Sequence, residues 1–179
     1  MDKEHSSHSF LHAYCKWPDV GFENQGKEEK VILMLRAHPI TQISWIINVL
    51  ILFILQIVAN LVFGGLLSPM SSFALNLFLV VFILSYGWIN VLVYLFNVGI
   101  VTNLKVLDVD FSAVIYKEVT EAKLEKIEDV TSKTSGYFAS IFNFGGVFIQ
   151  TAGTEANIEF LKVPRPTDVV QVVNDLTES

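Results

Sequence analysis

Charged side chains are missing from a long stretch in the middle of this chain. Between Ala37 and Leu104 there is no Asp, Glu, Lys or Arg, so this stretch does not form an ordinary solvated surface. Of all residues, 17% are charged and 52% are hydrophobic, whereas a soluble domain carries about 25% charged residues. The chain therefore divides into a polar N-terminal tail, an apolar middle and an acidic C-terminal part.

Cysteine and catalytic residue sets are also scarce. The one cysteine, Cys15, excludes an internal disulfide. The sequence after Leu104 has no histidine or cysteine, which excludes Ser/His/Asp and Cys/His sets there. No GxxxxGK[ST] or GxGxxG motif is present, and the glycines at 145–146 are interpreted as permitting a bend at the start of a strand. We therefore expect no enzyme activity, no catalytic residues and no cofactor.

The apolar middle fits a helical hairpin that crosses a membrane twice. Residues 43–63 reach about 32 Å as a helix at roughly 1.5 Å per residue, which matches a hydrocarbon core of about 30 Å. Residues 73–97 are long enough to span with some tilt, and the short segment "GGLLSPMSS" between the two runs can only turn the chain. The alternative is a pair of buried helices in a soluble core, but the rest of the chain is too small to cover them. The first 36 residues are too polar for a signal peptide, so the first span is expected to be an uncleaved anchor.

Basic residues at the ends of the hairpin predict its orientation. Lys27, Lys30 and Arg36 precede the first span, Lys105 follows the second, and the loop contains none. Because Lys and Arg are enriched on the cytoplasmic side of membrane proteins, both termini are expected in the cytosol.

Amide side chains recur on one face of each span. Asn60 and Asn76 lie at matching distances from the loop, as do Asn48 and Asn90, so we expect each pair to meet across the hairpin. Such hydrogen bonds typically contribute about 0.6 kcal/mol. A solute pathway and an oligomer interface are the alternatives, but pathways usually contain ionisable groups and these spans have none. The expected interhelical amides are Asn48, Gln56, Asn60, Asn76 and Asn90.

After residue 98 the pattern changes to short β-rich runs and ends with a helical one. Six short runs bounded by Gly, Asn, Asp or Ser predict an antiparallel sheet or barrel. The final segment "PTDVVQVVNDL" has an apolar stripe typical of a helix packed on one side. Residues 28–36 fit either a further strand or a short helix, and alternating β-branched residues slightly favour the strand.

Four segments in this order resemble the bacterial pleckstrin-homology-like (PH-like) domain: "GIVTNLKVLDVD", "EVTEAKLEKIEDV", "SGYFASIFNFGGVFIQTAG" and "PTDVVQVVNDL". More narrowly, the chain resembles small membrane proteins in which two spans precede one such domain, and "RAHP" resembles their juxtamembrane Arg-x-His. The resemblance implies an α+β membrane protein with a two-helix transmembrane hairpin and a small antiparallel PH-like β-barrel/sandwich capped by a C-terminal helix. The expected organisation is a flexible polar tail (1–27), a juxtamembrane strand or helix (28–42), the hairpin (43–98) and a cytosolic PH-like domain (99–179).

Aromatic residues near the end of the domain allow two interpretations. Tyr137, Phe138 and Phe142 either fill the end of the barrel, which is the favoured reading, or stay exposed and touch membrane or a partner. With Arg36 and His38 they form the set of candidate interface residues. In the flanking segments we expect two groups: core residues (Ile127, Val130, Phe144 and Val147) and water-exposed residues (Lys126 and Lys133).

The charge and histidine patterns argue against several ligands. The part after Leu104 has a net charge of −5, which argues against nucleic acid and against an anionic headgroup such as a phosphoinositide. His5, His8, His12 and Cys15 have a spacing that suits zinc on a helix. The serines among them favour a flexible tail, so we expect no metal site.

The composition and the resemblance together favour a binding protein of the bacterial cytoplasmic (inner) membrane. We expect a multi-pass, membrane-anchored PH-like binding or scaffolding module without catalytic activity. It would act through protein–protein contacts at the cytosolic membrane face. Its partners would be the lipid bilayer and either another protein or a second copy of the chain. The alternative is an accessory subunit of a membrane transport or secretion assembly.

Overall fold

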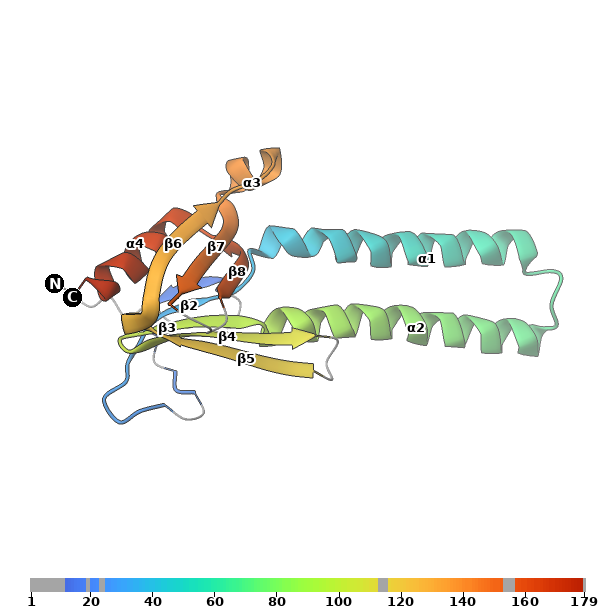
Figure 1. The fold of residues 1–179 in the computed structure, drawn as a ribbon. Coiled ribbons are helices and arrows are strands. Elements are labelled where there is room, and N and C mark those ends of the chain that lie inside the picture. The colour runs from blue at the N-terminus through green and yellow to red at the C-terminus, as the bar shows by residue number, and fades with distance from the viewer. Residues whose placement is uncertain (1–11, 19, 23–24, 113–115, 153–156, 179) are drawn as a thin grey trace.

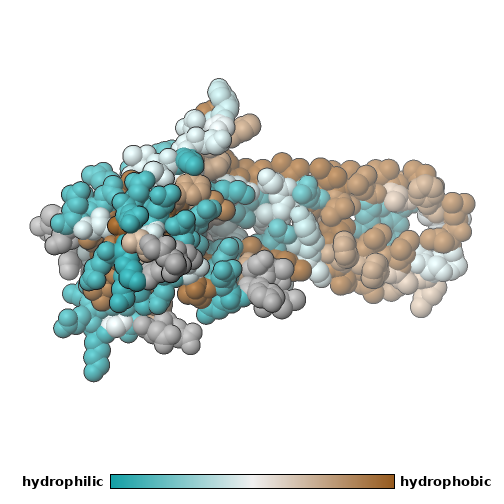
Figure 2. Space-filling view, in the orientation of Figure 1, coloured by the Kyte–Doolittle hydropathy of each residue, from teal (hydrophilic) through white to brown (hydrophobic). Residues whose placement is uncertain are grey.

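Two long helices extend side by side from a β-rich domain, and the C-terminal helix lies on the side of the domain away from them (Figure 1). The computed structural model describes residues 12–18, 20–22, 25–112, 116–152 and 157–178, and every statement below concerns these residues. Apolar side chains cover the helical hairpin, while polar ones dominate the domain (Figure 2).

The hairpin consists of α1 (Ile43–Phe63) and α2 (Pro69–Phe96). The second helix begins four residues before the expected residue 73, because Ser68 caps it: its Oγ accepts a hydrogen bond from the Ser71 N–H at 3.3 Å. Pro69 at the first helical position is compatible with this start, since it has no N–H to leave unpaired. Both helices are long and apolar enough to cross a membrane, and Ile83 alone among their described residues is buried.

The domain contains two antiparallel sheets, short helical segments and a C-terminal helix. In one sheet the strands lie in chain order: β1 (Tyr14–Lys16), β2 (Val31–Leu35), β3 (Val98–Thr102), β4 (Lys105–Ser112) and β5 (Tyr116–Lys123). The other sheet has β6 (Ile127–Lys133), β7 (Phe144–Thr151) and β8 (Ile158–Pro164). The remaining elements are the 3-10 turns η1 (Pro39–Gln42) and η2 (Leu124–Lys126), and the helices α3 (Tyr137–Phe142) and α4 (Pro166–Thr177).

The helical hairpin is inserted between two paired strands. β2 ends just before it and β3 begins just after it, yet the two strands are antiparallel neighbours in the same sheet. Leu35 lies opposite Gly99, and Met34 lies opposite Ile100. The domain therefore extends to both sides of the hairpin in sequence, whereas the sequence pattern predicted that it begins at residue 99.

The expected barrel is not closed. Within the described residues the two sheets share no hydrogen-bonded ladder, although β8 contacts β2, β4 and β5. Side chains from both sheets and from α4 meet in one core between them, where α4 packs on β6 and β7. The least exposed members of this core are Leu33, Leu35, Val101, Val106, Val147, Ile149, Ile158, Val169 and Val173.

The expected flexible tail includes a strand. β1 pairs with β2, with Cys15 opposite Met34, and Cys15 is buried. The serine and histidine content suggested flexibility, but Ala13 and Cys15 are small apolar residues two positions apart, and both side chains are buried. β1 satisfies the backbone of β2, which would otherwise be an open sheet edge. The segment 31–35 itself is a strand, the slightly favoured alternative.

Candidate functional site

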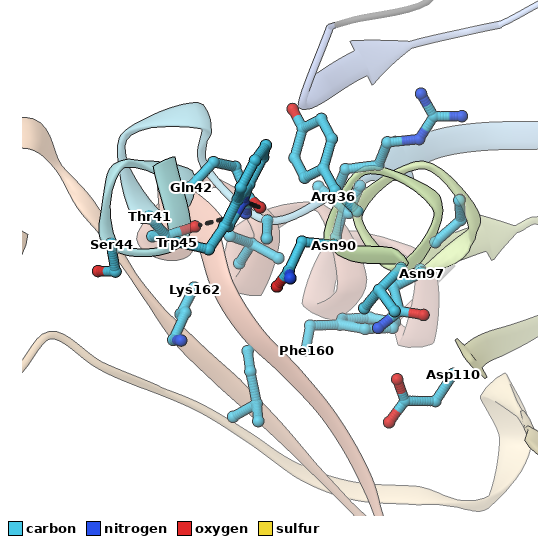
Figure 3. Close-up of a pocket in the computed structure, with 18 of the residues that line it drawn as sticks. Arg36, Thr41, Gln42, Ser44, Trp45, Asn90, Asn97, Asp110, Phe160 and Lys162 are labelled. Carbon is cyan, nitrogen blue, oxygen red and sulfur yellow. Dashed lines mark hydrogen bonds between the residues drawn. The ribbon is translucent and has the colours of Figure 1, made fainter. Parts of the chain in front are cut away.

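A polar space lies where the hairpin meets the domain. It is a cavity of about 470 Å³ with walls from both long helices, from the β2–η1 connection, and from β3, β4 and β8 (Figure 3). It thus joins segments that lie far apart in the sequence. This volume falls within the roughly 300–1,000 Å³ of ordinary small-molecule sites.

Amide side chains line the wall that the hairpin helices form. Asn48 of α1 and Asn90 of α2 both line the cavity, and the Asn90 Nδ2 donates to the Tyr86 carbonyl at 2.8 Å. No hydrogen bond joins Asn48 to Asn90 in the described part of the chain, so this expected pair shares a cavity rather than a direct contact. Beside them, the Trp45 Nε1 donates to the Gln42 Oε1 at 2.9 Å.

Carboxylates form the wall at β4. Asp108 and Asp110 occupy alternate positions after the fully buried Val106, so all three share one face of the strand. Glu118 lies directly opposite Asp110 on β5 and adds a third carboxylate to that face. Among the described residues no Lys, Arg or His lies within salt-bridge distance of Asp108 or Asp110. Burial, and then repulsion by Asp110 and Glu118, raises the pKa of Asp108 to about 6.

A cation comes from the opposite wall. Figure 3 shows Lys162 of β8 and Asp110 on opposite sides of the cavity. A bulge positions Lys162: between the pairs Gly145–Val163 and Val147–Phe160, β8 has two residues where β7 has one. Lys162 takes a left-handed backbone conformation there, with φ of 58°. Such a conformation is uncommon for a residue with a side chain.

The β2–η1 connection holds the candidate residues Arg36 and His38. Arg36 is half-buried at the cavity wall, its guanidinium points away from Asp110 (Figure 3), and burial lowers its pKa. Burial also lowers the pKa of His38, so this imidazole is neutral at pH 7. Its Nδ1 accepts a hydrogen bond from the Ile40 N–H at 3.2 Å, and its ring stacks on Phe144 at 5.6 Å between centroids. His38 therefore fixes the start of the hairpin against β7.

The aromatic segment is exposed. Tyr137 and Phe138 of α3 are 79% and 71% exposed, and Ile141 and Phe142 are also exposed. The favoured reading, that these aromatics fill the end of a barrel, is therefore wrong. Gly136, with φ of 97°, precedes the helix and Asn143, with φ of 50°, follows it. These two left-handed positions turn the chain away from the sheet and back, and α3 projects from the domain (Figure 1).

The residues expected in the core beside α3 have mixed positions. Val130 and Val147 are buried, and Lys126 and Lys133 are exposed. Ile127 is half-buried against the core. Phe144 is also only half-buried, because its ring stacks on His38 at the side of the sheet instead of entering the core.

A second group of amides lies further along the hairpin. Asn60 of α1 and Asn76 of α2 exchange two side-chain hydrogen bonds, one of them from Asn76 Nδ2 to Asn60 Oδ1 at 2.8 Å. Gln56 Nε2 also donates to Asn76 Oδ1 at 3.1 Å. These hydrogen bonds join the two helices, so their arrangement is that of a packing contact, although the Gln56 Oε1 is buried without a partner among the described residues.

The tail residues whose spacing suits zinc are His5, His8, His12 and Cys15. No group of three or more His, Cys, Asp or Glu side chains that could hold a metal occurs in the described residues. His12 is exposed and Cys15 buried, while His5 and His8 lie outside the described residues.

The sequence patterns did not identify Asp108, Asp110 and Lys162 as cavity residues. The two aspartates alternate with apolar residues in "KVLDVDF", a pattern that predicts a strand with its polar residues on the solvent face, so it did not indicate a cavity.

Comparisons with known proteins yield one match. The family model described as "Bacterial PH domain" matches residues 39–177, a range that includes both long helices, the strands from β3 to β8 and α4. Searches of curated proteins and of solved structures gave no match. The match covers well over half of the chain and confirms the resemblance seen in its strand and helix segments, so this chain belongs to the bacterial PH domain family.

Proposed function

We propose that this protein is a membrane-anchored binding or scaffolding module without catalytic activity. In this proposal the hairpin crosses the bacterial cytoplasmic membrane, both termini are cytosolic, and the domain acts through protein–protein contacts at the membrane face. The family supports a binding role, because PH-like domains are generally non-catalytic binding modules.

The observation that carries this proposal is the insertion of the hairpin between two paired strands. Asn97 alone separates α2 from β3, and η1 leads directly into α1. Phe96 at the end of α2 also packs on Phe111 of β4, with ring centroids 5.2 Å apart. With two short connections and no flexible linker, the hairpin fixes the direction in which the domain faces. A fixed orientation favours presentation of one surface to a partner.

The position of α3 supports contact with the bilayer. Phe144 follows this helix closely and stacks on His38, which directly precedes η1 and α1. The exposed Tyr137 and Phe138 are therefore held at the level where α1 begins, and Figure 1 shows α3 beside that point. Tyrosine and other amphipathic aromatics are enriched at membrane–water interfaces. We assign α3 to the interface, which leaves the rest of the domain surface for protein contacts.

The topology is tested by single cysteines in a Cys15→Ser background. Met70→Cys, in the first turn of α2 next to the hairpin loop, is expected to react with a membrane-impermeant maleimide in intact cells. Thr177→Cys, at the end of α4, is expected to react only after permeabilisation. Both residues are exposed, so they form a matched pair. The reverse labelling pattern, or labelling of both sites in intact cells, contradicts the proposed topology.

The protein contacts are tested by photo-cross-linking in native membranes. A photoreactive residue is placed at one exposed position per variant, at Val119, Lys126 or Gln171. We expect a discrete protein adduct at one of these sites, identified by mass spectrometry, and none at the others. Adducts absent from every site would contradict action through protein–protein contacts while leaving the topology result intact.

A further inference from the structure

We propose that the cavity between the hairpin and the domain binds the headgroup of an aminophospholipid. Its ammonium group would face Asp108 and Asp110, and its phosphate would face Lys162. This proposal rests on the membrane insertion proposed above, and it adds a ligand to the junction itself.

The cavity lies at the depth where headgroups are found. Its walls include Trp45 and Asn48, near the start of α1, and Asn90 and Tyr94, near the end of α2. The start of α1 and the end of α2 adjoin the domain, where the surface changes from apolar to polar (Figures 1 and 2). With the hairpin in a bilayer, this boundary coincides with the interfacial region, where Trp and Tyr side chains are enriched. A cavity at this depth is exposed to a high local concentration of lipid headgroups, whereas a soluble ligand would be dilute.

The carboxylates select for an ammonium group. Asp108 and Asp110 face the cavity without a cation at salt-bridge distance in the described part of the chain, and Glu118 adds to their negative field. Burial and these neighbours raise the pKa of Asp108 to about 6, because no nearby cation among the described residues compensates the charge of the ionised carboxylate. A primary ammonium supplies that charge and can donate up to three hydrogen bonds. A headgroup with only negative charge would instead be repelled by this wall.

The opposite wall suits a phosphate. The β8 bulge and left-handed backbone place Lys162 across the cavity from Asp110, and the Lys162 carbonyl accepts a hydrogen bond from the His38 N–H at 2.7 Å. Asn90 lies between the two charges, where an amide can donate to a phosphate oxygen (Figure 3). Lys162 on one side and the Asp108 and Asp110 carboxylates on the other match a zwitterion, which carries phosphate and ammonium separated by two carbons. Glu159 of β8 also lines the cavity and adds a further carboxylate that attracts the ammonium.

The test measures binding of short-chain lipids to the purified full chain in mild detergent. The probes are dihexanoyl phosphatidylethanolamine, phosphatidylcholine and phosphatidylglycerol, and free phosphoethanolamine distinguishes a lipid from a soluble source. We expect phosphatidylethanolamine to bind about tenfold more tightly than phosphatidylglycerol, the effect of one charge-assisted hydrogen bond. We also expect weaker binding of phosphatidylcholine, whose quaternary amine donates no hydrogen bond, and of phosphoethanolamine, which lacks acyl chains.

Two sets of variants assign the binding to the cavity. Asp108→Asn and Asp110→Asn are expected to remove the preference for phosphatidylethanolamine while keeping phosphatidylglycerol binding, and Lys162→Gln to weaken both lipids. Glu128→Gln and Lys30→Gln change exposed charges outside the cavity and serve as matched controls. Thermal melts verify that each variant is folded. The Asp→Asn variants are expected to fold, since they remove like-charge repulsion.

Equal binding of phosphatidylethanolamine and phosphatidylglycerol to the wild-type chain would overturn the proposal, as would wild-type preference in both Asp→Asn variants. Tighter binding of free phosphoethanolamine than of the lipid would also overturn it. The maleimide labelling described above is done on the same protein, so a failure of lipid binding with intact topology refutes this inference alone.

Discussion

Gly99→Ala is expected to destabilise the domain because it forces a methyl group into a filled site. Gly99 lies in β3, and a Cβ atom there would be 2.5 Å from Cε1 and 2.7 Å from Cδ1 of Phe160. The Phe160 ring comes from the other sheet, is only 3% exposed, and is surrounded by the main core. It cannot move away without displacing that core. At Gly99 a side chain of the other sheet therefore occupies the space that a Cβ atom would need.

The size of the effect follows from two opposing contributions. Overpacking a core typically costs about 1–3 kcal/mol. Replacing glycine by alanine stabilises by about 0.4–1 kcal/mol through the unfolded chain. The net expectation is a loss of about 1–2 kcal/mol, which corresponds to a decrease in Tm of roughly 4–8 °C per kcal/mol in a domain of this size. Near-UV circular dichroism melts of the full chain in one detergent measure it.

A matched glycine isolates the contact. Gly65→Ala makes the same chemical change in the hairpin loop, where nothing lies within 4 Å of the added carbon, and it should leave the Tm unchanged or slightly higher. Phe160→Leu in the Gly99→Ala background should recover part of the loss, because it removes the atoms that clash. If Gly99→Ala melts at or above Gly65→Ala, the close packing of the two sheets at β3 and β8 is refuted.

Three further outcomes are expected. The pKa of Asp108 lies at about 6 in the folded state and at 3.8 without the fold, so the folded state binds the proton more tightly and the free energy of unfolding falls as pH rises from about 4 to about 6. That pKa difference corresponds to about 3 kcal/mol, and solvent screening of a half-buried side chain reduces it to about 1–2 kcal/mol. Asp108→Asn should remove this pH dependence of the free energy of unfolding in denaturant titrations. A pH dependence that persists in the variant would contradict the expectation. Asn76→Leu breaks side-chain bonds to Asn60 and Gln56 and should cost about 1–2 kcal/mol in unfolding from detergent micelles; no loss would show that these amides do not hold the hairpin. Phe138→Ser should leave the Tm in detergent unchanged. In vesicles it should make α3 more accessible to a water-soluble quencher than in the wild type. Quenching equal to that of the wild type would contradict the position of α3 at the interface.

Local sequence patterns were sufficient for the elements with strong periodicity. The charge-free run at residues 43–63 coincides with α1, because a helix in this position needs only length and apolar side chains. The stripe of Val169, Val172, Val173 and Leu176 lies in α4, whose Val169 and Val173 are in the core. In both cases one element's own residues carry the information.

The same patterns could not reveal features that depend on distant partners. The cavity joins residues from before, within and after the hairpin, and no short window contains Asn90, Asp108 and Lys162 together. The strand β1 depends on the free edge of β2 rather than on its own three residues. The spacing of aromatics in α3 is the same for a buried and an exposed helix. What decides between them is the backbone at Gly136 and Asn143.

The insertion of the hairpin also explains why a cavity lies at this junction. Paired strands such as β2 and β3 lie about 4.8 Å apart, whereas packed helices have axes about 8–10 Å apart. The two chain segments must therefore diverge between the sheet and the hairpin, within the few residues of η1 on one side and Asn97 on the other. The side chains at this widening gap do not fill it, and Asn48 and Asn90, which line the space from α1 and α2, make it polar. The space follows from the topology, while the charges of Asp108, Asp110 and Lys162 determine what it can hold.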